Sequence, residues 1–500
     1  MSKQSSHKQI LQSSAIIGGS SVINILISLL RVKMVAVLLG PAGIGLISLL
    51  QNLMTTGSQI SALGLGNAGT RQIAEATGSN EEQKVDTARR ALFWGTLLLS
   101  AIGGVSLWLL RDVLAEQVLN DASLAPTVGW LGIGVALSVA SGSQSALLTG
   151  MRRIGDIARS QITSAFLSTL LGVGAIGWLG EKGLVLYILS VPFIGFIVGH
   201  VFVARLPGVK TPRSSMPALA GQWKVMLRLG FAFMLAGLAG TLGQLAVRTL
   251  VQRDLGAESL GYFQAAWAIS MTYLGFVLGA MGTDYYPRLT AAIHNREKAT
   301  RLVNEQTEVA LLLAGPVLLA MLGLAPWVIQ LLYSAEFAPA TSILRWQLLG
   351  DVLKVISWPM GFVIIAMGKG TLFMLTEIAV MALFVFGTWL LLPYIKLEAT
   401  GISFLVLYLV YAPMMLVVTR KLIGFRWQHH IKWEVAGLFT CAVMVAAAGH
   451  YHDVAGVALG LVFALIVGVR SLVKLANMAE LGGPAGKLAS LFQRQIQRFK

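Results

Sequence analysis

Runs of about 20 apolar residues recur along the whole chain, and each is long enough to cross a bilayer as a helix. Segment 183–204, for example, contains no Asp, Glu, Lys or Arg. Charged residues make up 12% of the 500 positions, which is about half of the roughly 25% found in ordinary soluble domains. These features exclude a soluble globular fold and predict an all-α polytopic membrane protein.

Turn residues divide the apolar sequence into about 14 predicted transmembrane helices. The predicted spans are 10–38, 43–66, 90–110, 127–149, 158–179, 183–204, 224–251, 259–284, 302–332, 340–367, 371–393, 398–419, 433–450 and 454–471. Lys and Arg gather in alternate connections, whereas the opposite connections hold only Arg111, Lys182, Arg253 and Lys396. By the positive-inside rule, this asymmetry places both termini in the cytoplasm.

The segment Gly64–Gly69 fits the pattern G-x-G-x-x-G, which binds dinucleotides when it follows a strand and opens a helix. Here it ends the predicted span 43–66 and enters the first cytoplasmic connection. No strand precedes it, so neither a dinucleotide site nor any other cofactor is predicted. We expect its glycines to allow close helix packing or bending.

An internal repeat relates two parts of the chain. Segment 38–48 (LLGPAGIGLIS) aligns with segment 254–264 (DLGAESLGYFQ), and the offset of about 216 places Gly40 on Gly256. The offset covers six predicted spans, so the copies have parallel topology and should be related by a pseudo-two-fold axis. The sequence therefore predicts two pseudo-symmetric six-helix lobes, residues 1–222 and 223–424, followed by an appended two-helix hairpin with a basic amphipathic tail, residues 425–500.

Ionisable side chains inside predicted spans are costly and by default mark a substrate or ion path. The intramembrane cations are Arg31, Lys33, Arg248, Arg345 and Lys354. Because the spans of the first lobe contain no carboxylate, a cavity there should favour an anionic headgroup such as a phosphate or pyrophosphate. Arg31 and Arg248 occupy equivalent repeat positions, although each lies close enough to a helix end for snorkelling to remain an alternative.

The intramembrane carboxylates are candidates for coupling transport to an ion. Asp351 lies three residues before Lys354 on one helix face, so a purely structural ion pair remains open. Glu377 is either paired with a cation on a neighbouring helix or protonatable, and Asp284 lies near a helix end. The histidines lack metal-ligand spacing, so no metal site is predicted. The basic stretch 487–500 favours anionic lipid headgroups over nucleic acid.

With the segments LLGPAGIGLISLLQ (38–51) and MGTDYYPRLTAA (281–292), residues 10–420 resemble the polysaccharide-transport branch of the multidrug/oligosaccharidyl-lipid/polysaccharide exporter superfamily. The likeness is strongest to O-antigen translocases of the Wzx type. It implies a flippase that moves undecaprenyl-pyrophosphate-linked oligosaccharide across the bacterial inner membrane by alternating access, coupled to an ion gradient. It also implies partnership with a polysaccharide polymerase or chain-length regulator.

The resemblance assigns the cationic cavity to Arg31 or Lys33 together with Arg248, and with less weight to Arg345 and Lys354. Three other functions remain open. The extra helical pair is similar to the fourteen-span flippases of the peptidoglycan lipid precursor. A drug/cation antiporter of the same superfamily is disfavoured by the carboxylate-free first lobe. An O-antigen polymerase or ligase is disfavoured by the short outer loops, so no enzymatic activity is predicted.

Overall fold

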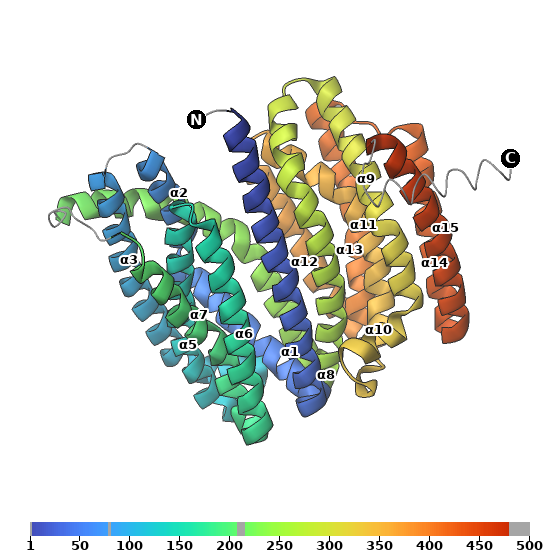
Figure 1. Ribbon diagram of the computed structural model, residues 1–500. Coiled ribbons are helices and arrows are strands. Elements are labelled where there is room, and N and C mark those ends of the chain that lie inside the picture. Colours follow the sequence, from blue (N-terminus) through green and yellow to red (C-terminus); the bar gives the residue numbers. More distant parts are fainter. Residues whose placement is uncertain (1–2, 79–81, 208–215, 480–500) are drawn as a thin grey trace. The chain divides into compact units, whose positions relative to one another are not determined.

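The computed structural model describes residues 3–78, 82–207 and 216–479, and every regular element within these ranges is a helix (Figure 1). The longer helices are α1 Lys3–Ala62, α2 Leu65–Gly78, α3 Glu82–Leu109, α5 Ala125–Gly150, α6 Ile154–Leu179, α7 Leu184–Ala204, α8 Met216–Ala292, α9 Arg296–Gly323, α10 Ala325–Leu332, α11 Ala340–Ala366, α12 Gly370–Ile395, α13 Glu398–Ile423, α14 His429–Tyr451 and α15 Asp453–Ala479. Short turns connect some of them: α4 Arg111–Leu114, η1 Ala115–Leu119, η2 Ala122–Leu124, η3 Gly180–Gly183 and η4 Ala335–Phe337.

The predicted spans fall on helical segments, although 43–66 runs from α1 into α2 and 302–332 covers α9 and α10. This confirms the all-α polytopic fold. Within the described ranges, ten helical stretches are long and apolar enough to cross a membrane. The stretch Ile154–Ala204 contains two of the predicted spans, and the stretch Gly19–Ala62 overlaps two others. Large apolar side chains also remain exposed, such as Trp178 at 90% and Tyr394 at 80%. Exposed apolar surface on this scale is what lipid covers in a membrane protein.

The chain divides by its internal contacts into two compact units, Met1–Gly261 (unit 1) and Tyr262–Lys500 (unit 2). Unit 1 contains α1 to α7 and the first part of α8, and unit 2 contains the rest. The lobes 1–222 and 223–424 and the hairpin 425–500 follow from the sequence repeat, which is a different criterion, and they stay a prediction.

Helices α1 and α8 are each bent at a single glycine. Gly40 has φ 62° and ψ −169°, and Gly256 has φ 85° and ψ 175°, a backbone region that essentially only glycine occupies. These are the two glycines that the repeat aligns. The next aligned pair, Gly45 and Gly261, lies in close contact within unit 1, where a Cβ on Gly45 would meet the backbone nitrogen of Gly261. Glycine at these positions thus permits both the bends and the close approach of the helices.

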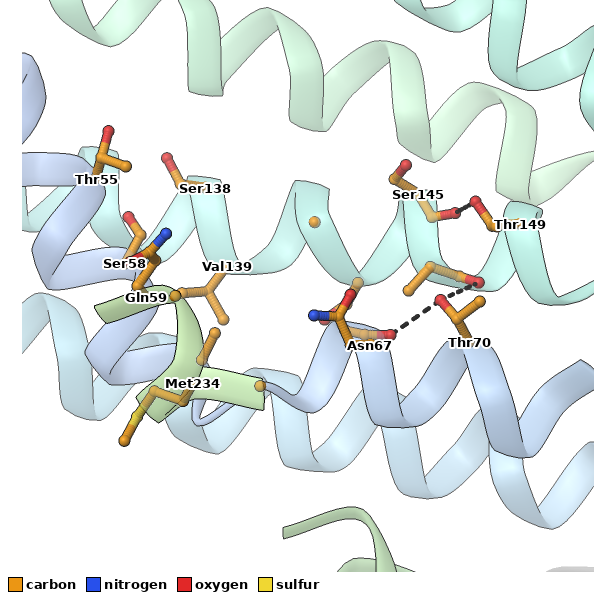
Figure 2. Close-up of a pocket in the computed structure, with 17 residues that line it drawn as sticks. Thr55, Ser58, Gln59, Asn67, Thr70, Ser138, Val139, Ser145, Thr149 and Met234 are labelled. Atoms are coloured by element: carbon orange, nitrogen blue, oxygen red, sulfur yellow. Dashed lines mark hydrogen bonds between the residues drawn. The ribbon is translucent and has the colours of Figure 1, made fainter. Parts of the chain in front are cut away.

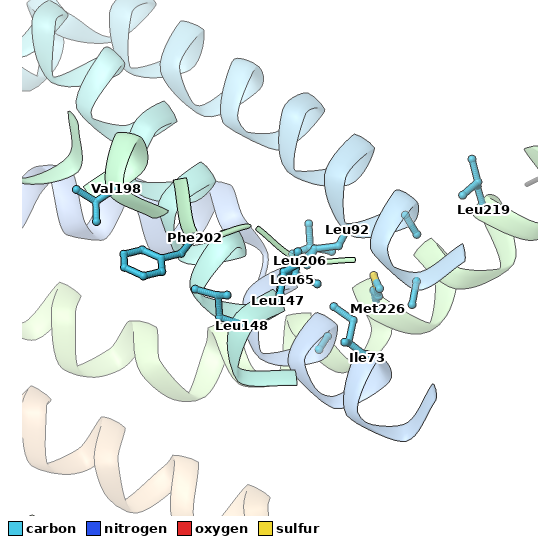
Figure 3. Close-up of a cluster of buried hydrophobic side chains, with 13 residues drawn as sticks. Leu65, Ile73, Leu92, Leu147, Leu148, Val198, Phe202, Leu206, Leu219 and Met226 are labelled. Carbon is cyan, nitrogen blue, oxygen red and sulfur yellow. The ribbon is translucent and has the colours of Figure 1, made fainter. Parts of the chain in front are cut away.

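Helix α2 lies where the sequence reading expected the first cytoplasmic connection. Its apolar residues Leu65, Ala68 and Ile73 are buried in a cluster with residues of α3, α5, α7 and α8, and Figure 3 shows Leu65 beside Leu147 of α5. Helix α2 has 14 residues, so a search for apolar spans of about 20 residues does not detect it. Its apolar residues recur on one helix face only. The segment containing G-x-G-x-x-G is therefore a packed helix.

The C-terminal helices of unit 2 are fastened by ion pairs. The Lys474 ammonium of α15 contacts the carboxylate of Glu308 on α9 and lies 2.7 Å from that of Glu434 on α14. Arg470 lies 3.0 Å from the same Glu434 carboxylate. The two acidic side chains are each only 10% exposed, so this cluster joins α9, α14 and α15 in a sheltered position. The basic stretch 487–500 lies outside the described residues.

Candidate functional site

Unit 1 contains a cavity of about 610 Å³, which we call the polar cavity. Its lining residues are Thr55, Ser58, Gln59, Ala62, Gly64, Gly66, Asn67, Thr70, Ser138, Val139, Gly142, Ser143, Ser145, Ala146, Thr149, Met234 and Gly237. Figure 2 shows their side chains converging from α1, α2, α5 and α8. Hydroxyl groups, amides and small side chains dominate, and no charged residue occurs among the described residues that line it. The volume lies within the roughly 300–1,000 Å³ of small-molecule sites.

Local helix geometry fixes the hydroxyl groups of this lining. The hydroxyls of Thr55, Ser58 and Thr149 each donate to the backbone carbonyl four residues earlier, at 2.8, 2.7 and 2.8 Å. The Thr70 hydroxyl donates to the carbonyls of Gly66, at 3.0 Å, and Ala146, at 3.3 Å, and so links α2 to α5. Hydrogen bonds to helix carbonyls therefore fix the positions of these hydroxyl groups, and all of them lie on helices.

The bend between α1 and α2 places the start of α2 at the polar cavity. Gly64 has φ +67°, and a Cβ there would collide with the Gly230 backbone of α8. This agrees with the expectation that the glycines of the motif allow bending and close packing. Gly66 and Asn67, the next positions of the motif, line the cavity. The segment therefore contributes to the lining as well as to the bend.

Unit 2 contains a second cavity of about 310 Å³, which we call the charged cavity. Its lining residues are Lys354, Ser357, Trp358, Gly361, Phe362, Ile365, Phe373, Glu377, Val380, Met381, Tyr408 and Tyr411, from α11, α12 and α13. The basic side chain of Lys354 and the acidic side chain of Glu377 face the same space, and aromatic rings form much of the wall. Glu377 thus shares this space with a cation of a neighbouring helix, and the two alternatives given above for Glu377 stay predictions.

The predicted pair Asp351 and Lys354 is not joined by a direct ion pair within the described structure. Asp351 is completely buried, and its Oδ2 accepts a hydrogen bond of 2.6 Å from the hydroxyl of Ser270 on α8. The Lys354 Nζ instead lies 3.1 Å from the Met271 sulfur and 5.9 Å from the ring centre of Tyr408. The two charges are close enough to interact electrostatically, but they have separate partners.

Arg31 contacts Tyr187 of α7, a residue of the same unit. Its Nε donates to the Tyr187 hydroxyl at 2.9 Å, and its guanidinium carbon lies 4.3 Å from the centre of the ring. The Nη2 atom is buried and has no hydrogen-bond partner among the described residues. A donor in this situation suits an acceptor oxygen supplied by a ligand. Lys33, two residues later, is half-buried.

Arg248 lies in the part of α8 that belongs to unit 1 and is only 4% exposed. Its Nη1 lies 3.3 Å from both the backbone carbonyl and the side-chain oxygen of Gln244, one turn earlier. This burial argues against a side chain that extends into the headgroup region. Neither Arg248 nor Arg31 lines the polar cavity.

Arg345 and Asp284 complete the predicted set. Arg345 on α11 donates to the Gly449 carbonyl at 2.6 Å and to the Asp453 carboxylate at 2.8 Å. It therefore fastens the turn between α14 and α15, and it lines neither cavity. Asp284 lies on α8, and its side chain is outside the described part of the structure. Elsewhere in the described ranges, no cluster of His, Cys, Asp and Glu is arranged to hold a metal ion.

Sequence reasoning missed the polar cavity because it searched the spans for charges. Serine and threonine are common in transmembrane helices, where their hydroxyls bond to the preceding turn. A usable signal is nevertheless present in segment 138–149, where Ser138, Ser143, Ser145 and Thr149 follow one another within two to five residues on α5. Such density of hydroxyls in one span indicates a wet surface.

Known proteins resemble this chain in sequence and in fold. Residues 34–342 match the family described as polysaccharide biosynthesis protein. The lipid III flippase of Escherichia coli (strain K12) is 25% identical over 402 residues, which cover 78% of this chain and 94% of that protein.

Among solved structures, an inward-facing multidrug resistance MATE family transporter of the MOP superfamily superposes with a TM-score of 0.68 at 20% identity, covering 80% of this chain and 94% of the other. The lipid II flippase MurJ, in an inward closed conformation, superposes with a TM-score of 0.67 at 10% identity, covering 93% of this chain and 99% of the other. At these identities, the likeness establishes a shared fold.

Proposed function

The chain belongs to the polysaccharide biosynthesis protein family, and from this premise we propose that it is a flippase for lipid-linked oligosaccharide. Family membership confirms the resemblance to the polysaccharide-transport branch that segments 38–51 and 281–292 indicated. The proposed substrate is an undecaprenyl-pyrophosphate-linked O-antigen unit or a related surface glycan unit. The proposed route is from the cytoplasmic to the periplasmic leaflet of the bacterial inner membrane by alternating access, coupled to an ion gradient.

The polar cavity is the observation that carries this proposal. A lipid-linked glycan has a hydrophilic headgroup that cannot cross the hydrocarbon unaided, because its hydrogen-bonding groups would lose their partners. The cavity has a volume of about 610 Å³ and an uncharged, hydrogen-bonding lining. The relative named as a lipid III flippase, aligned over 94% of its own length, supports a substrate of this class.

Arg31 and Arg248 are proposed to hold the pyrophosphate, since a guanidinium donates to two phosphate oxygens at once. The terminal Nη2 of Arg31, which is buried and has no partner among the described residues, supports this role for Arg31. Lys33 stays a secondary candidate. Arg345 is fastened to the turn between α14 and α15, so we propose for it a lesser role in binding than the other cations have.

The charged cavity is the proposed place of ion coupling. Glu377 lines this cavity, whereas Asp351 is buried on α11 outside the lining. Their carboxylates alternate between ion-bound and ion-free states, and Lys354 lies near both. Asp284 remains a third candidate. Both termini are proposed to be cytoplasmic, and a polysaccharide polymerase or chain-length regulator is the proposed partner.

Two other cargoes fit the same family less well. A peptidoglycan lipid precursor has the same type of headgroup, and the likeness to MurJ, which is of fold only, keeps it as the second candidate. A drug/cation antiporter needs acidic groups to attract its cargo, and the described lining of the polar cavity contains none.

The test is transport in vesicles that contain the purified full-length protein. A fluorescent undecaprenyl-pyrophosphate oligosaccharide should move between leaflets faster than in protein-free vesicles. Arg31→Ala and Arg248→Ala should slow it at least tenfold, because each removes a charge-assisted contact of about 1.5–3 kcal/mol. Arg301→Ala, which removes a guanidinium 77% exposed and paired with Glu305, should not. Movement no faster than in empty vesicles, under every ion gradient tried, would contradict the proposal.

A further inference from the structure

We propose that the polar cavity binds the glycan part of the substrate, specifically its uncharged, hydroxyl- and acetamido-bearing sugar rings, while the pyrophosphate is held elsewhere. This inference rests on the proposed function and names the part of the substrate that one site recognises. It assigns a binding role to residues that sequence reasoning left out, among them Asn67, Thr149 and Gly142.

The hydrogen-bonding state of the hydroxyl groups determines which ligand fits. Thr55, Ser58 and Thr149 each use their single hydroxyl proton on a backbone carbonyl of their own helix. A hydroxyl has one proton to donate and two lone pairs to accept with. These groups therefore present acceptors to the cavity, and the ligand must supply the protons. Sugar hydroxyls and the N–H of an acetamido group are donors of this kind.

The same accounting excludes the pyrophosphate from this cavity. A phosphate group at neutral pH carries acceptor oxygens and negative charge, so it requires donors and cations. The described lining residues include no Lys, Arg or His. Arg31 and Arg248, which are proposed to hold the pyrophosphate, belong to the same unit and lie outside the lining. Headgroup and glycan would thus be recognised by different residues of the same unit.

Two amides supply the donors that a sugar also needs. The Gln59 Oε1 accepts a hydrogen bond of 2.7 Å from the hydroxyl of Thr241 on α8, which orients the amide so that its NH₂ group remains to donate. Asn67 is exposed at the start of α2 and forms no hydrogen bond to other described residues. An amide can bond to a ring oxygen, a hydroxyl oxygen or an acetamido carbonyl. The site thus combines fixed acceptors with two donors.

Small residues leave the room that a sugar ring requires. A Cβ built on Gly142 of α5 would meet nothing within 4 Å, so the space beside this glycine is open to a ligand. A side chain at this position would begin in open space and extend into the cavity that Gly142 lines. Gly174 on α6 provides a matched control, because its Cβ would likewise meet nothing within 4 Å and it is not part of the lining.

The test measures binding by the full-length protein in lipid nanodiscs, with two probes. One probe is undecaprenyl pyrophosphate, and the other is the same lipid carrying a trisaccharide of N-acetylglucosamine. The wild-type protein should bind the glycan probe at least tenfold more tightly. Gly142→Leu should abolish this preference and Thr149→Val should reduce it about 2- to 10-fold, the value of one hydrogen bond. Affinity for the bare lipid should not change in either variant.

Two controls separate a binding effect from a folding effect. Gly174→Leu should keep the preference. So should Thr290→Val, because the Thr290 hydroxyl makes the same bond to the carbonyl four residues earlier, at 2.8 Å, outside the cavity. A wild-type protein without preference for the glycan probe, or a Gly142→Leu variant that keeps the preference, would overturn the inference.

Transport of the glycan probe, measured in parallel, distinguishes the two proposals. If the protein transports the glycan probe but Gly142→Leu does not change its binding preference, the sugar site is wrong and the flippase function stands. If Gly142→Leu abolishes the binding preference but the wild-type protein transports neither probe, the sugar site stands and the flippase function is wrong.

Discussion

The polar cavity of unit 1 and the charged cavity of unit 2 differ in chemistry, although the sequence predicts a repeat of the chain around them. The first is about 610 Å³ and has an uncharged lining of hydroxyls and amides. The second is about 310 Å³ and contains Lys354 and Glu377 among aromatic rings. The aligned glycines Gly40 and Gly256 share one backbone conformation. The aligned glycines therefore have the same backbone bend, whereas the side chains that line the two cavities differ in chemistry.

The largest expected effect comes from removing the cation of the charged cavity. Lys354→Gln leaves Asp351 and Glu377 without a nearby positive charge, which should destabilise the protein by about 3 kcal/mol and reduce transport at least tenfold. Lys354→Gln/Glu377→Gln restores the charge balance and should recover most of the stability. Thermal unfolding and vesicle transport measure the two effects. Lys369→Gln, at an exposed position, should change neither, and an equal loss there would show that the cavity is not special.

The second effect compares glycines with positive φ in the two units. Gly64 (φ +67°) faces the Gly230 backbone, whereas Gly368 (φ +69°) has open space around it. Gly368→Ala should cost about 1 kcal/mol for the left-handed conformation. Gly64→Ala should cost about 2–3 kcal/mol, because overpacking adds to that strain. The unfolding temperatures of the two variants measure these costs. Equal shifts would contradict the close approach of α8 to the bend at Gly64.

The smallest effect compares buried serines beside the two cavities. Ser270 donates to the carboxylate of Asp351 at 2.6 Å, and Ser143 accepts from the Thr96 hydroxyl at 2.6 Å. Ser270→Ala should cost about 1.5–3 kcal/mol, because its partner is an acidic group, and Ser143→Ala about 0.5–1.5 kcal/mol. Denaturant unfolding ranks them. A larger loss of stability for Ser143→Ala would contradict the stronger hydrogen bond expected between Ser270 and the Asp351 carboxylate.

The sequence predicted the helices well because the bilayer imposes a strict length on them. Segment 371–393, for example, was identified by apolar character alone and corresponds to α12, Gly370–Ile395. Helix α2 was missed because 14 residues with one apolar face give no such signal. The two glycine bends were visible as an alignment of Gly40 with Gly256, although sequence does not reveal their dihedral angles.

The candidate sites were harder to predict because function depends on contacts between distant segments. Arg345 and Arg31 look alike in the sequence, since both are arginines within spans. In the structure, the two terminal nitrogens of Arg345 are bonded to Gly449 and Asp453, whereas the terminal Nη2 of Arg31 is buried without a partner among the described residues. The hydroxyls of segment 138–149 are visible in the sequence, but they line a cavity only because α1, α2, α5 and α8 converge in the structure.

The single-residue bends at Gly40 and Gly256 have a practical consequence for mapping the orientation of the chain. Reporter insertion and limited proteolysis both depend on exposed loop tips, and at these two positions one helical segment follows the other with a single intervening residue. An inserted epitope there would break a helix instead of extending a loop. The exposed turn at Asn120–Asp121, between η1 and η2, is a suitable place for such a reporter.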